Sequence, residues 1–67
     1  MIHATLRAMQ QGREAARIAG KDAESPYNPM HPLFDAWWQS LVVSYDCRDW
    51  PAEQVFKTVY PRLKRKH

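Results

Sequence analysis

The chain has 67 residues, of which 45% are hydrophobic and 25% charged, and ten Lys and Arg against seven Asp and Glu give a net charge of +3. This length allows one domain with a thin core, the composition excludes a disordered chain, and the weakly basic balance permits a nucleic-acid partner without requiring one. No apolar run is long enough for a membrane span, and no signal-peptide core is present. The single cysteine, Cys47, cannot form an internal disulfide, so a cytoplasmic protein is expected.

The sequence predicts an all-α fold in a single helical domain over residues 1–67, and the first helix is expected over residues 4–19. Its small and apolar residues share one side: Leu6, Met9, Gly12, Ala16 and Ala19, with Ala8 and Ala15 at the margin. The opposite side carries Arg7, Gln10, Glu14 and Arg17, with Arg13 at the boundary. Small side chains let another helix approach closely, which would explain a glycine inside a helix.

Residues 20–32 are expected to form a stiff loop that is rich in proline. Gly20 follows the last periodic residue and is expected to end the first helix in a left-handed conformation. Three prolines then fix the backbone: Pro26, Pro29 and Pro32. Tyr27 and Met30 are expected to fold back over the small face of the first helix.

A second helix is expected over residues 33–46, with Pro32 near its first position. Bulky residues recur there with helical spacing: Phe34, Trp37, Trp38, Leu41, Val42 and Tyr45. Because this bulky face complements the small face of the first helix, the two are predicted to pair as an antiparallel helical hairpin.

A third, C-terminal helix is expected over residues 50–61, with Asp49 as its N-cap and Pro51 in its first turn. Glu53 and Lys57 have the spacing of an i, i+4 ion pair. The apolar stripe of this helix consists of Ala52, Phe56, Val59, Tyr60 and Leu63.

Pro61 is expected to kink or end the third helix, because it lacks an N–H and its ring clashes with the carbonyl of Lys57. Residues 62–67 would then form a basic tail with the sequence RLKRKH. Such a tail could contact phosphates, and a solubilising C-terminus without a partner is an equally open interpretation.

One long segment combines spaced glycines, a Pro-Tyr turn and tryptophan. The sequence RAMQQGREAARIAG is followed by ESPY and then by a helix that carries tryptophan. This framework resembles the ribosome modulation factor family and its small phage- and plasmid-borne relatives. The matching residues are Arg7, Ala8, Gln10, Gly12, Ala19, Gly20, Pro26 and Tyr27. The resemblance covers roughly residues 7–41 and implies a short helical hairpin.

The resemblance also implies a function, ribosome hibernation. Members of the family bind the small ribosomal subunit and promote inactive ribosome dimers, and some relatives have been linked to antibiotic resistance. The chain departs from the family pattern in two places. The second helix reads AWWQSL, without the glycine and second tryptophan of the W-x-x-G-W motif, and the helix from Trp50 onward has no counterpart in the short ribosomal factor.

The leading hypothesis is therefore a non-catalytic regulator of translation that binds the ribosome or ribosomal RNA through the basic side of its first helix. The candidate RNA-binding residues are Arg7, Arg13, Arg17, Lys21, Tyr27, Arg62, Lys64, Arg65 and Lys66. Phosphate binding by these cations would depend strongly on salt. The alternatives are a solvated polar face for the cations and a tyrosine that plugs the open end of the hairpin.

The second hypothesis is a phage-type protein-interaction module that regulates or inhibits a host protein, with a homodimer as a further option. Its candidate contacts are Trp37, Trp38 and Trp50, since tryptophan is enriched at binding hot spots. Trp37 and Trp38 are adjacent and about 100° apart on a helix, so they cannot both point fully inward. Core packing is the alternative for both.

An enzyme, a metal site and a cofactor are not expected. The residues that could ligate a metal are scattered without a known spacing: His3, His31, Cys47 and His67. Cys47 has Asp46 and Asp49 nearby but no local histidine to activate it as a nucleophile. A small modifying enzyme is the third and weakest hypothesis.

Overall fold

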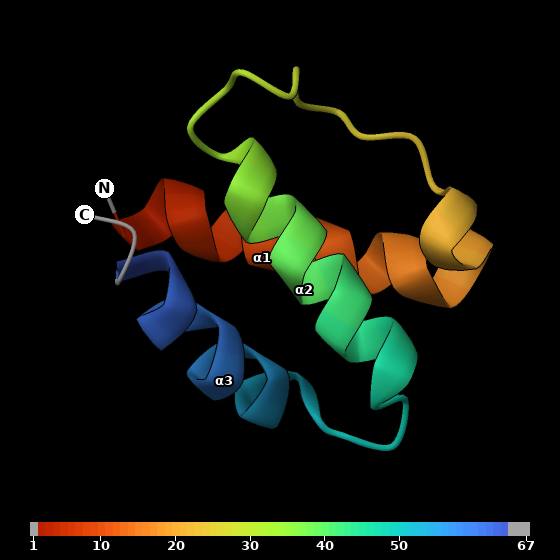
Figure 1. Cartoon of the computed structure of the whole chain (residues 1–67). Helices are drawn as coiled ribbons and strands as arrows, with labels where there is room; N and C mark the ends of the chain where they lie inside the picture. Colours follow the sequence, from red (N-terminus) through yellow and green to blue (C-terminus); the bar gives the residue numbers. More distant parts are fainter. Residues whose placement is uncertain (1, 65–67) are drawn as a thin grey trace.

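A computed structural model describes residues 2–64 of the chain, and within that range the protein is helical and contains no strand. The helices are α1 (Ile2–Ala19), α2 (Phe34–Asp46) and α3 (Ala52–Lys64), and a single 3₁₀ turn, η1 (Gly20–Asp22), follows α1 (Figure 1). The all-α class, with a helical hairpin and a further helix, is therefore confirmed.

The antiparallel partners of the hairpin are α2 and α3, rather than α1 and α2 as predicted (Figure 1). Where α1 and α2 contact each other, later residues of α1 meet later residues of α2. Near the start of the contact, Ser40 Oγ donates to the Met9 carbonyl oxygen at 2.6 Å. Near its end, Lys21 Nζ lies 3.9 Å from the carboxylate of Asp46. The two helices thus cross in the same chain direction.

The connection between α1 and α2 explains this crossing. After η1 the chain runs back along α1 before it enters α2 (Figure 1). Leu33, at the end of the connection, lines a surface hollow together with Ala4 and Arg7 from the first turns of α1. A long connection can return the chain in this way, whereas the short connection 47–51 forces α2 and α3 to run antiparallel.

The predicted end of α1 is confirmed, and the predicted start of α2 lies slightly too early. Gly20 has a φ of 63°, the left-handed conformation that a glycine adopts without a steric penalty. Pro32 lies in a turn closed by a hydrogen bond from the Phe34 N–H to the His31 carbonyl at 3.0 Å, so the helix begins after it.

The predicted N-cap of α3 and the predicted end of the helix at Pro61 are wrong. Asp49 is not its N-cap, because the helix begins at Ala52 and the first carbonyl to accept a helical bond is that of Pro51, from the Val55 N–H at 3.2 Å. Pro61 does not end the helix. It lies inside the helix near the C-terminus, where its missing N–H forfeits a single backbone bond.

The basic residues predicted to form a C-terminal tail therefore lie partly in α3 and partly outside the described residues. Arg62 and Lys64 belong to the last turn of α3 rather than to a tail. The predicted contacts of Arg65 and Lys66 lie outside the described residues. The ion pair expected within α3 is confirmed, since Lys57 Nζ lies 3.3 Å from the Glu53 carboxylate.

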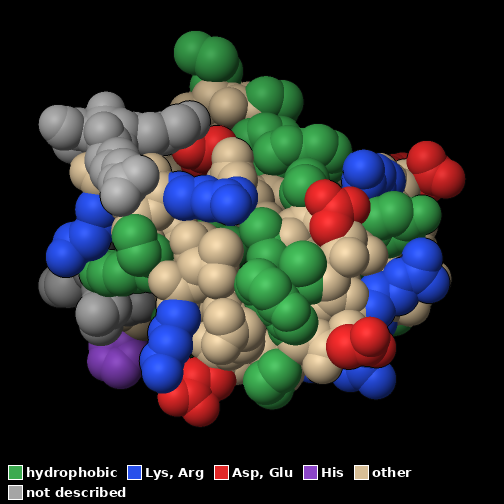
Figure 2. Space-filling model, turned by 60° about the horizontal axis from the view of Figure 1, so that its bottom comes forward, with side chains coloured by type: hydrophobic (Ala, Val, Ile, Leu, Met, Phe, Trp, Pro, Cys, Tyr) green, Lys and Arg blue, Asp and Glu red, His purple; other side chains and the backbone are tan. Residues whose placement is uncertain are grey.

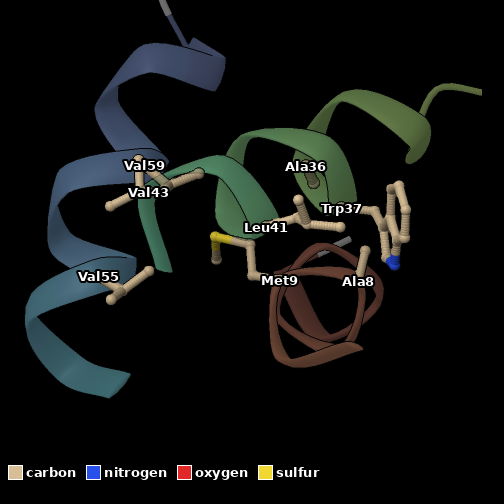
Figure 3. Close-up of a cluster of buried hydrophobic side chains, with 8 residues drawn as sticks. All are labelled: Ala8, Met9, Ala36, Trp37, Leu41, Val43, Val55 and Val59. Atoms are coloured by element: carbon tan, nitrogen blue, oxygen red, sulfur yellow. The ribbon is translucent and has the colours of Figure 1, made fainter. Parts of the chain in front are cut away.

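The core lies where the three helices meet, and Figure 3 shows its side chains converging from all of them. It consists of Ala8, Met9, Ala36, Trp37, Leu41, Val43, Val55 and Val59. A Cβ added to Gly12 would lie well inside 3.0 Å of the Trp37 carbonyl oxygen. The predicted close approach of α2 to the small face of α1 is thus confirmed at Gly12.

The two loop residues expected to cover α1 behave differently. Tyr27 packs against the core, and its hydroxyl donates a hydrogen bond to Gln11 Oε1. Met30 is 91% exposed, so the prediction that it folds back is wrong. The backbone of Met30 is instead held in the turn around Asn28, since its N–H donates to Asn28 Oδ1 at 2.9 Å.

Replacing Ser40 with alanine is expected to lower the free energy of unfolding by about 1 kcal/mol, since the buried hydrogen bond to Met9 joins α1 to α2. Urea denaturation of the variant and the wild type measures the change. Thr58→Ala is the control, because the exposed Thr58 hydroxyl bonds only within its own helix, to Gln54. Equal effects of the two substitutions would contradict the assigned role of Ser40.

Candidate nucleic-acid interface

Basic side chains from two separate parts of the chain gather around Tyr45, near the C-terminal end of α2. We call this group the Tyr45 cation cluster, and it consists of Arg13, Arg17, Lys21 and Arg48. Lys21 Nζ lies 5.2 Å from the centre of the Tyr45 ring, and Arg48 Cζ lies 5.1 Å from it. Cation–π attraction to the ring therefore helps to hold these two side chains in place.

The backbone brings the cluster together at two points. The left-handed Gly20 turns the chain after α1 so that η1 lies against the end of α2, which places Lys21 beside Tyr45. The short connection after α2 keeps Arg48 beside the same ring. Because α1 and α2 run in the same direction, the last turns of both helices contribute to one end of the molecule (Figure 1).

A hollow of about 320 Å³ opens within the cluster. It is lined by Arg13, Ala16, Arg17, Ser44, Tyr45, Cys47, Arg48 and Trp50. The small side chain of Ala16 leaves space between the two helices. The hydroxyl of Ser44 is buried and has no hydrogen-bond partner within residues 2–64.

Acidic neighbours only partly neutralise the cluster. Glu14 lies 3.6 Å from Arg17, and Asp46 lies 3.9 Å from Lys21. Both ion pairs are more than half exposed, so each contributes little. Arg13 and Arg48 make no ion pair within the described part of the chain, which leaves two guanidinium groups available to an anionic ligand.

Positive charge does not cover the whole protein. On the face shown in Figure 2, hydrophobic side chains gather near the centre, and the Lys and Arg side chains around them are interspersed with Asp and Glu. Attraction for an anionic polymer must therefore come from local groups of cations. The Tyr45 cation cluster is such a group, and its side chains come from α1, from η1 and from the connection after α2.

The other predicted RNA-binding cations lie elsewhere. Arg7 is exposed on the first half of α1 and lines a separate hollow with Gln10 and Leu33. Arg62 and Lys64 are exposed on the last turn of α3, which lies beside the N-terminal end of α1 (Figure 1). Lys64 Nζ lies 5.3 Å from the centre of the Tyr60 ring.

Tyr27 lies outside the cluster and has structural contacts. Its hydroxyl donates a hydrogen bond to Gln11 Oε1, its backbone N–H donates to Ser25 Oγ at 2.9 Å, and its ring centre lies 5.3 Å from that of His31. These contacts tie the proline-rich connection to α1. They favour a structural role for Tyr27 over a role in base stacking.

The three tryptophans have three different environments. Trp37 is 2% exposed and belongs to the core, so it cannot contact a partner. Trp38 is 37% exposed and stacks on Phe34, with an angle of 5° between the two ring planes. Trp50 is half-buried and lines the hollow of the cation cluster.

Sequence reasoning missed Arg48 and Ser44. Arg48 lies in a connection without periodicity, so no helical face assigns it to a side of the protein. Ser44 could have been singled out from the sequence, because a small polar residue stands there between the apolar Val43 and the aromatic Tyr45 of the bulky helix.

Within residues 2–64, no group of His, Cys, Asp and Glu side chains is arranged to hold a metal ion. Cys47 is half-buried and free. In the same range, none of the helices has the length and apolar character needed to cross a lipid bilayer.

No known family matches the chain, and neither does a curated protein or a solved structure. The resemblance to the ribosome modulation factor family, carried by residues such as Gly12 and Tyr27, therefore stays a prediction from sequence motifs.

Proposed function

We propose that the chain is a non-catalytic, cytoplasmic RNA-binding protein that binds the ribosome or ribosomal RNA through the Tyr45 cation cluster and thereby regulates translation. The observation that supports this most directly is the convergence of Arg13, Arg17 and Lys21 with Arg48 around one aromatic ring. Guanidinium groups are well suited to phosphate, because their planar fork forms two parallel hydrogen bonds to its oxygens.

Binding to bacterial ribosomes is expected to weaken about 50-fold between about 50 and 200 mM salt, since four cations that neutralise phosphates on unpaired RNA release their counterions with a slope of about −0.7 each. Sedimentation of the protein with ribosomes and with isolated small subunits across this salt range measures the change. Failure to sediment with either particle at the lowest salt concentration would remove ribosome binding from the proposal.

The second candidate function is a protein-interaction module that regulates or inhibits a host protein, as in the phage-type hypothesis. A specific observation favours it: Trp38 remains partly exposed on top of Phe34, next to a connection whose Met30 is almost fully exposed. Such an aromatic surface suits a hydrophobic contact with another protein.

Capture from a host lysate with and without nuclease separates the two functions. If the protein binds RNA, ribosomes or other RNA-containing particles should be captured without nuclease and lost after nuclease treatment. Retention of one protein after nuclease treatment, and its loss in Trp38→Ala, would support the second function. Size measurement of the purified protein tests the homodimer option in the same preparation.

A further inference from the structure

The Ser44 hydroxyl is buried without a partner. Ser44 is 7% exposed, and its Oγ contacts no hydrogen-bonding group within residues 2–64. A serine or threonine in a helix often donates to the carbonyl four residues earlier, as Thr58 does to Gln54 at 3.0 Å. Since Ser44 makes no such bond and its Oγ is shielded from solvent, its burial costs free energy. A ligand in the hollow would recover part of this cost when the side chain rotates toward it and the hydroxyl donates a hydrogen bond.

The surroundings of Ser44 indicate the chemistry of that ligand. Ser44 lines the hollow of about 320 Å³ together with the arginines Arg13, Arg17 and Arg48. Three guanidinium groups and a hydroxyl donor suit an anion with several oxygens, such as a phosphate group. The volume lies at the lower end of the range for small-ligand clefts, which suits one nucleotide rather than a larger molecule.

The hollow also offers one aromatic side chain to a base. The Tyr45 ring is already contacted by Lys21 and Arg48, whose charged groups lie 5.2 Å and 5.1 Å from its centre. Trp50 lines the same hollow and has no such cation on its ring within the described residues. An unpaired base gains stability by stacking on an aromatic ring of this kind.

We propose that this hollow binds a single unpaired nucleotide of an RNA chain, with the phosphate held by the arginines and Ser44 and the base against Trp50. This inference rests on the proposed function and names its substrate class: unpaired rather than double-stranded RNA. An unpaired nucleotide can turn its base into a hollow, whereas a duplex keeps its bases stacked and presents only its backbone and groove edges.

A carboxylate of an acidic protein is the main competitor for the same groups, since it also accepts paired hydrogen bonds from a guanidinium. The aromatic ring distinguishes the two ligands, because a nucleotide has a base to stack on Trp50 and a glutamate or aspartate has none.

The test uses the full chain and two labelled probes, a single-stranded RNA of about twelve nucleotides and the duplex of the same sequence, with affinity measured by fluorescence anisotropy. The wild type is expected to bind the single strand at least about tenfold more tightly than the duplex. Ser44→Ala is expected to weaken binding of the single strand about fivefold and to leave duplex binding unchanged.

Ser40→Ala is the matched control, since Ser40 is also buried on α2 but donates to Met9. The two variants are expected to behave oppositely. Ser40→Ala should lower the melting temperature without changing RNA affinity, while Ser44→Ala should retain or raise the melting temperature because it removes a hydroxyl without a partner.

The outcomes separate the two proposals. Equal binding of both probes, with no effect of Ser44→Ala, overturns the nucleotide site and leaves RNA binding intact. Absence of binding to either probe overturns the proposed function itself. Poly-glutamate and unlabelled single-stranded RNA are each tested as competitors of the labelled single strand. If poly-glutamate displaces the probe as well as the RNA does at equal monomer concentration, the hollow belongs to an acidic protein and the nucleotide site is overturned.

Discussion

Replacing Gly12 with alanine is expected to lower the free energy of unfolding by about 3 kcal/mol, because the added methyl group would overlap the backbone of α2. The new Cβ would lie well inside 3.0 Å of the Trp37 carbonyl oxygen and 3.1 Å from the Leu41 amide nitrogen. Both are backbone atoms of a packed helix, so neither can turn away as a flexible side chain would. The two helices would have to separate.

The expected loss is large for a protein of this size. Domains are stabilised by about 0.05–0.15 kcal/mol per residue, so the whole chain has about 3–10 kcal/mol to lose. A drop of about 15 °C or more in melting temperature, followed by circular dichroism, is the corresponding measurement. An alanine at this position that unfolds no earlier than the wild type would contradict the close crossing of α1 and α2.

A matched control separates packing from helix propensity. Alanine is favoured over glycine in a helix by about 1 kcal/mol, so propensity alone predicts that Gly12→Ala stabilises the protein. Gln10→Ala introduces alanine on the exposed side of the same helix and is expected to change stability by less than about 0.5 kcal/mol. Because helix propensity predicts a more stable Gly12→Ala variant and packing predicts a less stable one, the sign of the change shows which effect dominates.

The same glycine illustrates what the sequence reveals about this fold. Helical spacing of small residues around Gly12 and of bulky residues around Trp37 identifies the two surfaces that meet, because burial imposes that spacing on any packed helix. It does not give the direction of crossing. A face of small residues accepts a partner helix in either direction, and the choice depends on the path of residues 23–33 back along α1.

Helix ends depend on similar competition. Local preference makes Asp49 a good N-cap and Pro61 a poor helix interior residue. In the structure, the helix instead begins after Pro51 and continues to Lys64, because Val59 of the predicted stripe, together with Val55, which that stripe left out, is buried against the other helices. Tertiary packing of an apolar face provides most of the stability of a short helix, so it outweighs one lost backbone bond.

Part of the candidate site could be predicted from the sequence. Arg13 and Arg17 could be identified because the polar side of a helix is readable from its spacing, and Lys21 because it follows that helix directly. Arg48 could not, since it joins the cluster only through the fold of the connection onto Tyr45. The sequence also offered Arg7 and Tyr27 with equal weight, and only the structure shows that they lie outside the cluster.

Reversing two charges of the cluster, in the double variant Arg13→Glu and Arg48→Glu, is expected to weaken binding of single-stranded RNA at least about 100-fold at about 50 mM salt. These arginines have no carboxylate partner within residues 2–64, so their replacement breaks no ion pair there. Each glutamate removes an attraction to phosphate and adds a repulsion, and the slope of affinity against salt should fall accordingly. Fluorescence anisotropy at several salt concentrations measures both quantities.

The matched control is Arg7→Glu with Arg62→Glu, which changes the net charge of the protein by the same amount. Both residues are exposed and lie outside the cluster, so the control is expected to weaken binding less than about fivefold. Similar losses in the two double variants would mean that overall charge attracts the RNA and that the cluster has no special role. A large loss confined to the cluster variant, with unchanged circular dichroism, would locate the binding surface where α1 and α2 end together.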